Sequence, residues 1–268
     1  MTSDPSSPIL WRLDARGVAT VTFNRPEVNN AYNGEFIAGV LGAMDTLGKE
    51  PSLRVVVLRG AGKHFQAGAD LKWIRALAAR PAEDNLAASC DTATVVRRLN
   101  ELPVPTVALV QGGCFGGGTG IVAACDVVIA AEDAVFSIAE TRWGLMGGII
   151  LPQLADAIGV RQVRRYAQTG ERFDAHEARR IGLAHEVVPL AELEAAGERA
   201  VDQLLQNAPV ANAQTKAVAL EYAWGRMSDE TFTRLVAQHA AKRQSVEAAE
   251  GLASFAEKRP ARWYRPPA

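Results

Sequence analysis

The feature that most constrains this chain is a glycine-rich stretch, Gly112–Gly120, in which six of nine residues are glycine. It follows an apolar strand predicted over Thr106–Val110 and leads into a helix predicted over Ile121–Cys125. An ordered glycine costs roughly 0.5–1 kcal/mol relative to alanine, so the fold must need bare backbone here. Unpaired N–H groups at a helix N-terminus favour a phosphate, a carboxylate or a developing oxyanion. The stretch therefore predicts a ligand site made of backbone N–H groups, with a tight turn as the alternative.

Composition excludes several classes of function. The chain has 268 residues, of which 48% are hydrophobic, and its net charge of −1 gives no electrostatic reason to expect nucleic acid or an anionic membrane as partner. No run of about 18 apolar residues occurs, and Met1–Pro8 lacks the apolar core of a signal peptide. Its three cysteines, Cys90, Cys114 and Cys125, form no C-x-x-C pair. We expect a cytoplasmic protein with reduced thiols and no metal site.

The order of predicted elements indicates an α/β protein. Strands are predicted within Trp11–Phe23 and over Arg54–Gly60, Thr106–Val110, Val127–Ala131 and Leu183–Val188. Helices are predicted over Gly34–Lys49, in two pieces between Leu71 and Arg98, and over Ile149–Gly159, Gln162–Gly170, Asp174–Gly182, Glu192–Gln206, Ala208–Gly225, Ser228–Arg243 and Ser245–Lys258. Repeated strand, glycine loop and helix units favour stacked βα turns. The two pieces after Leu71 are expected to cover the site. The alanine-rich helices after Leu190 have few large apolar side chains, so we expect them to pack onto another subunit.

Two catalytic patterns receive weak support or none. Gly118-x-Gly120-x-x-Ala123 matches a loose dinucleotide-binding fingerprint, but the next strand ends in alanine where an acidic residue should follow. A nicotinamide-dependent enzyme is therefore kept only as an alternative. Neither a Gly-x-Ser-x-Gly motif nor zinc-ligand spacing of histidines is present. Cys114 suits a small buried thiol better than a nucleophile, and His64 suits a polar loop residue.

Glu140 is a candidate acid/base. It follows the run Ala134–Ala139, which is apolar apart from Ser137. Burial of a carboxylate in such surroundings raises its pKa toward the range useful for proton transfer. A surface ion pair between Glu140 and Arg142 is an equally valid interpretation of the local sequence.

Taken together, these motifs resemble the enoyl-CoA hydratase/isomerase (crotonase) superfamily over nearly the whole chain. The motifs are Asn24–Glu27 with Asn30-Ala31, Phe65–Leu71, Gly116–Gly118, Cys125-Asp126, Phe136–Glu140, Gly170–Ala175 with Glu177-Ala178, and Glu250–Arg259. The Gly-Gly-Gly-x-Gly pattern and the segment Ala157–Tyr166 look like bacterial methylglutaconyl-CoA-type hydratases, which act on branched chains.

The resemblance implies a crotonase-like spiral of ββα turns with a C-terminal α-helical trimerisation region. It divides the chain into a core domain, 1–195, and a helical oligomerisation region, 196–268, and implies a homotrimer or a hexamer built as a dimer of trimers. The implied substrate is an acyl-CoA thioester, so coenzyme A enters as part of the substrate and no separate cofactor is expected.

The resemblance also assigns the site residues. Glu140 would be the catalytic acid/base, and the backbone N–H groups of Ala69 and Gly117 would form an oxyanion hole for the thioester oxygen, as the glycine-rich stretch itself suggests. The implied substrate-binding residues are Gln66, Ala67, Asp70, Leu71 and Gly116, with Gly120 beside the reacting carbons and Phe255 and Lys258 reaching a neighbouring subunit's nucleotide.

One departure bears on the reaction. Two-carboxylate hydratases carry a second glutamate in the helix after the glycines, where this chain has Gly120. We expect an enoyl-CoA hydratase, with a double-bond isomerase as the alternative, since one carboxylate suffices to move a proton along an acyl chain. A non-catalytic CoA-binding module is a further alternative, against which the presence of Glu140 argues. The fold alone does not decide among them.

Overall fold

The computed structural model describes residues 4, 6–222, 246, 250, 257–263 and 265. The helix expected over Ser228–Arg243 lies outside these residues, and Ser245–Lys258 is described only at isolated positions and at its end.

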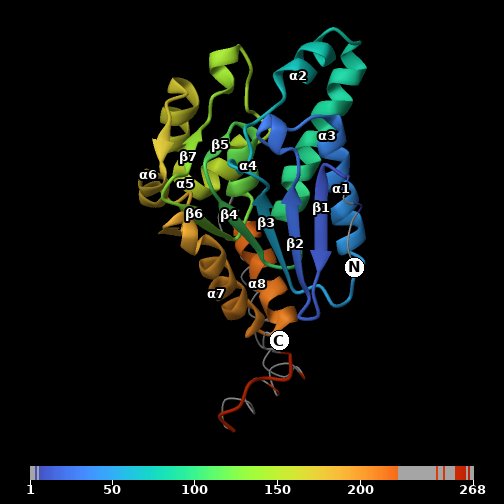
Figure 1. Ribbon diagram of the computed structural model, residues 1–268, viewed down its shortest axis with the longest axis vertical. Helices are drawn as coiled ribbons and strands as arrows, with labels where there is room; N and C mark the ends of the chain where they lie inside the picture. The colour runs from blue at the N-terminus through green and yellow to red at the C-terminus, as the bar shows by residue number, and fades with distance from the viewer. Residues whose placement is uncertain are drawn as a thin grey trace, which may run out of the picture.

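A six-stranded sheet forms the centre of the molecule (Figure 1). Its strands, in spatial order, are β1 (Ile9–Leu13), β2 (Val18–Phe23), β3 (Val55–Gly60), β4 (Thr106–Val110), β6 (Val127–Ala131) and β9 (Glu186–Val188). β1 and β2 pair antiparallel, and every later pair is parallel. The strands expected from the sequence are thus present, and the apolar runs are those of a sheet covered on both faces.

Side-chain alternation along the strands divides the core into two layers. Val55 and Val57 of β3 pack with α7 (Leu193–Leu205), whereas Val56 and Leu58 belong to the larger cluster on the opposite face. Helices contribute to that larger cluster from α1 (Gly34–Leu47), α3 (Ala82–Asn100), α4 (Gly117–Ala123), α5 (Leu151–Thr169) and α6 (Ala175–Ile181). The core is divided in two because successive residues of a strand point to opposite faces of the sheet. The boundary expected between the core domain, 1–195, and the helical oligomerisation region, 196–268, falls inside α7, a helix that packs on the sheet.

A second, smaller sheet, of which one strand lies inside the glycine-rich stretch, was not expected from the sequence. β5 (Gly113–Phe115) pairs parallel with β7 (Val135–Ser137), which pairs antiparallel with β8 (Phe173–Asp174). The prediction of a helix over Ile121–Cys125 was wrong at its start, because α4 begins at Gly117 and ends at Ala123. Glycine has low propensity for both strand and helix, and tertiary pairing overrides that propensity here.

Isolated bridges extend the second sheet to the loops of two earlier turns. Gln66 pairs with Cys114 and Tyr32 pairs with Ala69, both in parallel orientation. Through these contacts, the segment before α1, the segment after β3 and the segment after β4 are stacked side by side. The stacking brings Ala69 and the start of α4 to the same end of the main sheet.

The remaining helices agree with most sequence expectations. α2 (Leu71–Ala78) and α3 are separated near Pro81. Gly159, with φ 74° and ψ 148°, interrupts α5 where two helices were expected. Short 3-10 turns span Pro26–Val28, Glu140–Trp143 and Leu190–Glu192. None of the residues of α8 (Pro209–Tyr222) is buried.

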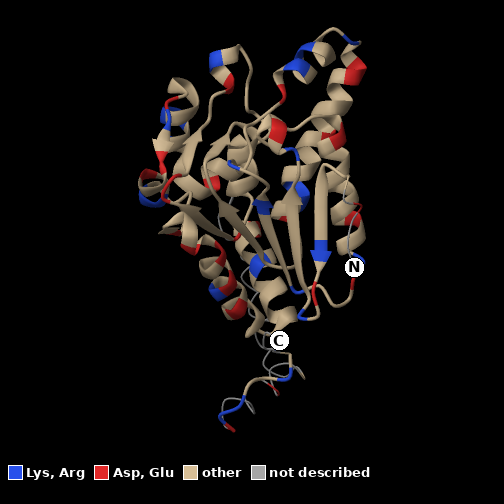
Figure 2. Cartoon of the chain, in the orientation of Figure 1, with Lys and Arg blue, Asp and Glu red and all other residues tan. Residues whose placement is uncertain are grey.

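Figure 2 shows acidic and basic residues interspersed along the helices, while the central strands carry few of either. Within the described residues, no helix combines the length and the apolar character that crossing a bilayer requires.

Candidate active site

A cavity of about 510 Å³ lies where the second sheet meets α2, α3, α4 and the segment after β7. Its walls include the loop residues Ala67–Ala69, the start of α4 at Gly116 and Gly117, and Glu140. The two helices after Leu71 contribute Trp73, Ile74, Leu77, Thr92, Val95 and Val96. They therefore cover the site as the sequence indicated.

Glu140 places its carboxyl group beside two glycines at the cavity. A β-carbon added to Gly116 would lie 3.0 Å from Glu140 Oε1, and one added to Gly147 would lie 3.2 Å from its Cδ. Oε2 is buried and accepts no hydrogen bond from the described residues. Burial raises the pKa of the Glu140 carboxyl above its usual range. A buried oxygen left unpaired is costly, so an acceptor in this position can accept a hydrogen bond from a water molecule or a ligand in the cavity.

The ion pair between Glu140 and Arg142, which the local sequence left open, does not form among the described residues. Arg142 instead donates to the carbonyl oxygen of Thr169 at 3.5 Å. Glu140 thus lies in the environment expected of an acid/base group.

Two backbone N–H groups of the cavity lining, those of Ala69 and Gly117, have no acceptor among the described residues. The Ala69 N–H is flanked by two hydrogen bonds that Tyr32 makes with Gly68 and Asp70, both 2.9 Å long, which fix the loop. No hydrogen bond of the described chain uses the N–H of Ala69 or Gly117. Gly116 adopts φ 52° and ψ −121°, a conformation open to glycine, and this turns the chain so that α4 starts at Gly117. Such a pair of donors suits an oxygen that gains negative charge.

Gln66 and Asp70 support the loop and do not line the cavity. Gln66 is fully buried, and its Oε1 accepts from the Gly68 N–H at 2.8 Å. Asp70 Oδ1 caps α2 by accepting from the N–H groups of Lys72 at 3.0 Å and Trp73 at 3.4 Å, and its Oδ2 lies 3.6 Å from Arg25 Nη2. In the single chain these side chains hold the shape of the segment that presents Ala69.

The other expected binding residues fall into three groups. Ala67, Leu71 and Gly116 line the cavity. Gly120 does not line it, because an added β-carbon would lie 2.2 Å from Ile150 Cγ2. Lys258 is exposed and lies outside the cavity lining, and Phe255 lies outside the described residues.

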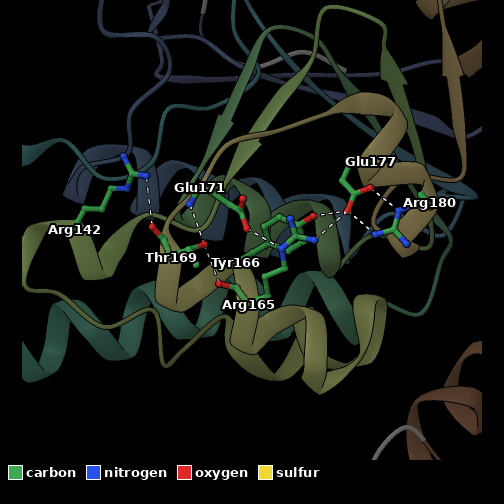
Figure 3. A network of polar contacts seen from close by, with 7 residues as sticks. All are labelled: Arg142, Arg165, Tyr166, Thr169, Glu171, Glu177 and Arg180. Atoms are coloured by element: carbon green, nitrogen blue, oxygen red, sulfur yellow. Dashed lines mark hydrogen bonds and ion pairs between the residues drawn. The ribbon is translucent and has the colours of Figure 1, made fainter.

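A polar network supports the wall of the cavity near Gly170 and Arg172. Figure 3 shows the Tyr166 hydroxyl donating to Glu177, whose carboxylate pairs with Arg180 at 2.5 Å, and Arg165 pairing with Glu171 at 2.8 Å. Ser137 Oγ donates to the Gly170 carbonyl oxygen at 3.0 Å. These contacts join the end of α5 to β7 and α6.

Residues considered for other chemistry have structural roles. Cys114 is fully buried, and burial raises the pKa of its thiol well above the usual range. His64 Nδ1 accepts from the Gly113 N–H at 2.8 Å and so braces the glycine stretch. In the part of the chain that the structure describes, no cluster of His, Cys, Asp and Glu is arranged to hold a metal ion.

Sequence reasoning missed several residues of the site. Tyr32, Phe36 and Trp73 line the cavity, and Gly147 lies against the Glu140 carboxyl. The only sequence signal for Tyr32 is that an aromatic residue stands in the polar segment before α1. The two arginines Arg142 and Arg172 also line the cavity, the second with its guanidinium carbon 5.4 Å from the centre of the Phe115 ring.

Comparison with known proteins identifies the family. Residues 14–266 match the family described as enoyl-CoA hydratase/isomerase. The chain is 33% identical to the hydroxycinnamoyl-CoA hydratase-lyase of Pseudomonas fluorescens over 82% of each chain. It is 31% identical to the mitochondrial Delta(3,5)-Delta(2,4)-dienoyl-CoA isomerase of Dictyostelium discoideum, over 93% of this chain and 88% of that protein.

Comparison with solved structures supports the same family. A crystal structure of an enoyl-CoA hydratase from Shewanella pealeana superposes with a TM-score of 0.90 at 34% identity, covering 95% of each chain. The expected crotonase-like α/β fold with C-terminal helices is thereby confirmed. The relatives carry out different reactions, so the comparisons define the class of enzyme and not the individual reaction. The chain belongs to the enoyl-CoA hydratase/isomerase (crotonase) family, whose enzymes act on acyl-CoA thioesters.

Proposed function

We propose that this enzyme is an enoyl-CoA hydratase that adds water to the double bond of a 2-enoyl-CoA. The observation that carries the proposal is the position of Glu140. Its buried carboxyl group, with one oxygen unpartnered among the described residues, shares a cavity with the free N–H groups of Ala69 and Gly117.

In this proposal the thioester oxygen accepts hydrogen bonds from Ala69 and Gly117. Water attacks C3, one of its protons passes to Glu140, and the π electrons move toward the thioester to form an enolate. The two N–H donors stabilise the enolate oxygen. Glu140 then gives its proton to C2, so one molecule of water has been added and the carboxylate is restored. The raised pKa of Glu140 supports both halves of this exchange, because it brings the pKa nearer to neutral pH.

The lining of the cavity supports an acyl chain that is mainly apolar. Phe36, Ile37, Val95, Val96 and Ile121 contribute to its wall. Arg142 and Arg172 also lie in the lining and offer charges for a distal carboxylate, as a glutaconyl-type substrate would require. A branched 2-enoyl-CoA, with or without such a carboxylate, is therefore our preferred substrate class.

The remaining roles concern coenzyme A and the neighbouring subunit. We infer that Ala67, Leu71 and Gly116 contact the thiol end of coenzyme A, since all three line the cavity. Gln66 and Asp70 shape this segment from behind. Phe255 and Lys258 are proposed to cover the nucleotide of a neighbouring subunit in a trimer or hexamer. We also propose a cytoplasmic location, which the three free cysteines suit.

A double-bond isomerase is the second candidate. It is favoured by one observation: among the described residues that line the cavity, Glu140 is the only carboxylic acid. Removal of a proton from C2 and its return to C4 needs one carboxylate and no bound water.

Oxygen-18 water separates the two reactions. The enzyme is incubated in oxygen-18 water with a branched 2-enoyl-CoA and, separately, with a 3-enoyl-CoA. The masses of the products are measured by mass spectrometry. Hydration places the label in the acyl chain. Migration of the double bond without label would show isomerisation instead. The variant Glu140→Gln serves as control and should lose about 10²–10⁴ in rate in either reaction. Binding of coenzyme A without turnover of any substrate would favour the non-catalytic module.

A further inference from the structure

Tyr32 occupies a position in the cavity to which no role has been given. Its ring lies against the start of α4, where a β-carbon added to Gly117 would come within 2.6 Å of Tyr32 Cε1. The carboxyl group of Glu140 lies against the neighbouring glycine, with its Oε1 3.0 Å from a β-carbon added to Gly116. The phenol and the carboxylate therefore flank the same peptide unit, whose Gly117 N–H points to the proposed thioester oxygen.

The ring of Tyr32 is held in place from two sides. Its backbone N–H donates to the Gly68 carbonyl oxygen and its own carbonyl oxygen accepts from the Asp70 N–H, each at 2.9 Å. Trp73 contacts the ring edge to face, with 6.0 Å between the ring centres. A ring fixed in this way loses little further freedom when its hydroxyl makes a hydrogen bond.

The hydroxyl of Tyr32 is available to the reactants. No hydrogen bond of the described residues uses it, whereas the hydroxyl of Tyr166 donates to Glu177. Burial, followed by the nearby negative charge of Glu140, raises the pKa of Tyr32 to about 12. The phenol thus stays neutral at physiological pH, where it can donate one hydrogen bond and accept others but cannot act as a base.

We propose that Tyr32 Oη accepts a hydrogen bond from the attacking water molecule, on the opposite side from Glu140, and so replaces the second carboxylate that Gly120 cannot supply. This inference rests on hydration as the proposed function. Glu140 takes one proton of the water and later delivers it to C2. The second proton stays on the oxygen that bonds to C3, and Tyr32 accepts a hydrogen bond from it throughout. Tyr32 neither gains nor loses a proton, so the reaction still adds one water molecule.

The test compares two reactions at the same carbons, of which one needs water as a reactant. Hydration of a 2-enoyl-CoA is measured in wild type and in Tyr32→Phe, which keeps the ring packed on Gly117. Exchange of the C2 hydrogen of butyryl-CoA in deuterated water is measured in parallel, since it requires Glu140 and the N–H donors but no attack at C3. Tyr222→Phe removes the same atom outside the cavity lining and serves as the matched control.

The inference predicts that Tyr32→Phe lowers kcat for hydration about ten- to a hundredfold, with KM within about twofold and C2 exchange unchanged. Tyr222→Phe should match wild type in both reactions. Hydration by Tyr32→Phe at the wild-type rate would overturn the inference while leaving the hydratase proposal standing. An equal fall of hydration and exchange would also overturn it, because it would indicate a general effect on the site. Failure of the wild-type enzyme to add water to any 2-enoyl-CoA would instead remove the proposed function itself.

Discussion

Ile150 fills the space that a side chain at position 120 would need, with its Cγ2 2.2 Å and its Cβ 2.6 Å from a β-carbon added to Gly120. Gly120 is fixed by this packing at the point where α4 crosses the start of α5. The space beside position 120 is therefore already filled, and a glutamate side chain could not be placed there without moving Ile150.

The contact predicts that Gly120→Ala destabilises the protein. Overpacking of a closed core costs about 1–3 kcal/mol, and an approach as close as 2.2 Å to Ile150 Cγ2 calls for the upper part of that range. This outweighs the roughly 1 kcal/mol that alanine gains over glycine in a helix. The control is Gly42→Ala in α1, where no atom lies within 4 Å of the added β-carbon and a small gain is expected. Denaturant unfolding measures both. In the background of Ile150→Ala, which removes Cγ2 but keeps Cβ, the cost of Gly120→Ala should fall but not vanish; an unchanged cost would contradict the packing argument.

Glu140→Gln should increase stability at neutral pH although it removes activity. Burial raises the pKa of Glu140 in the folded state above the model-compound value of 4.5. The neutral carboxyl is therefore favoured by folding, so its contribution to stability is present below pH 4.5 and is lost as the pH rises through the raised pKa. Glutamine remains neutral at every pH and avoids this loss. Thermal unfolding at pH 7 should give a higher Tm for the variant, and the difference should shrink below pH 4.5. A lower Tm at pH 7 would show that the charged carboxylate is stabilised by contacts other than those described.

Sequence patterns anticipated those parts of the fold that depend on local composition. The continuous apolar runs in β3, β4 and β6 and the glycine at the break in α5 were read correctly, since burial and backbone conformation leave local signals. The apolar run before Glu140 indicated desolvation only as one of two equal interpretations, the other being a surface ion pair with Arg142.

Contacts between distant segments were not predictable in the same way. β5 consists of three residues inside a glycine-rich stretch, and its pairing partners, Val135–Ser137 and Gln66, lie far away in the sequence. Tyr32 was missed for the same reason, because only the parallel bridge to Ala69 brings it to α4. Gln66 and Asp70 were expected near the ligand from the family motif, and only the structure shows that their side chains brace the loop.

The Gly117 N–H can be tested separately from the space around it. Gly117→Pro removes the donor, while Gly117→Ala adds the same β-carbon near Tyr32 and keeps the N–H. Proline is acceptable at the first position of a helix, so α4 should still form. If the donor binds the thioester oxygen in the transition state, the proline variant should turn over about 10²–10³ times more slowly than the alanine variant. Circular dichroism confirms folding of both proteins. Equal rates for the two variants would exclude Gly117 from the oxyanion hole.

The helix α8 is expected to take part in assembly of the chain into an oligomer. None of the residues of this helix is buried in the single chain, and Val210 is 54% exposed. The helix is nevertheless anchored to the core, because Lys216 Nζ lies 2.8 Å from Asp126 Oδ2, and the same oxygen accepts from the Thr106 N–H at 2.8 Å. An anchored helix whose described residues all remain at least partly exposed in the single chain is suited to contact between subunits.

We expect light scattering at micromolar concentration to give three or six times the chain mass of 28.6 kDa. Val210→Asp should weaken the assembly, because it places a charge on α8. Leu190→Asp, at a residue of matching exposure, 53%, in the turn before α7, should leave the mass unchanged. A monomeric wild type would contradict the prediction, and an assembly that responds to Leu190→Asp but not to Val210→Asp would place the interface on another surface.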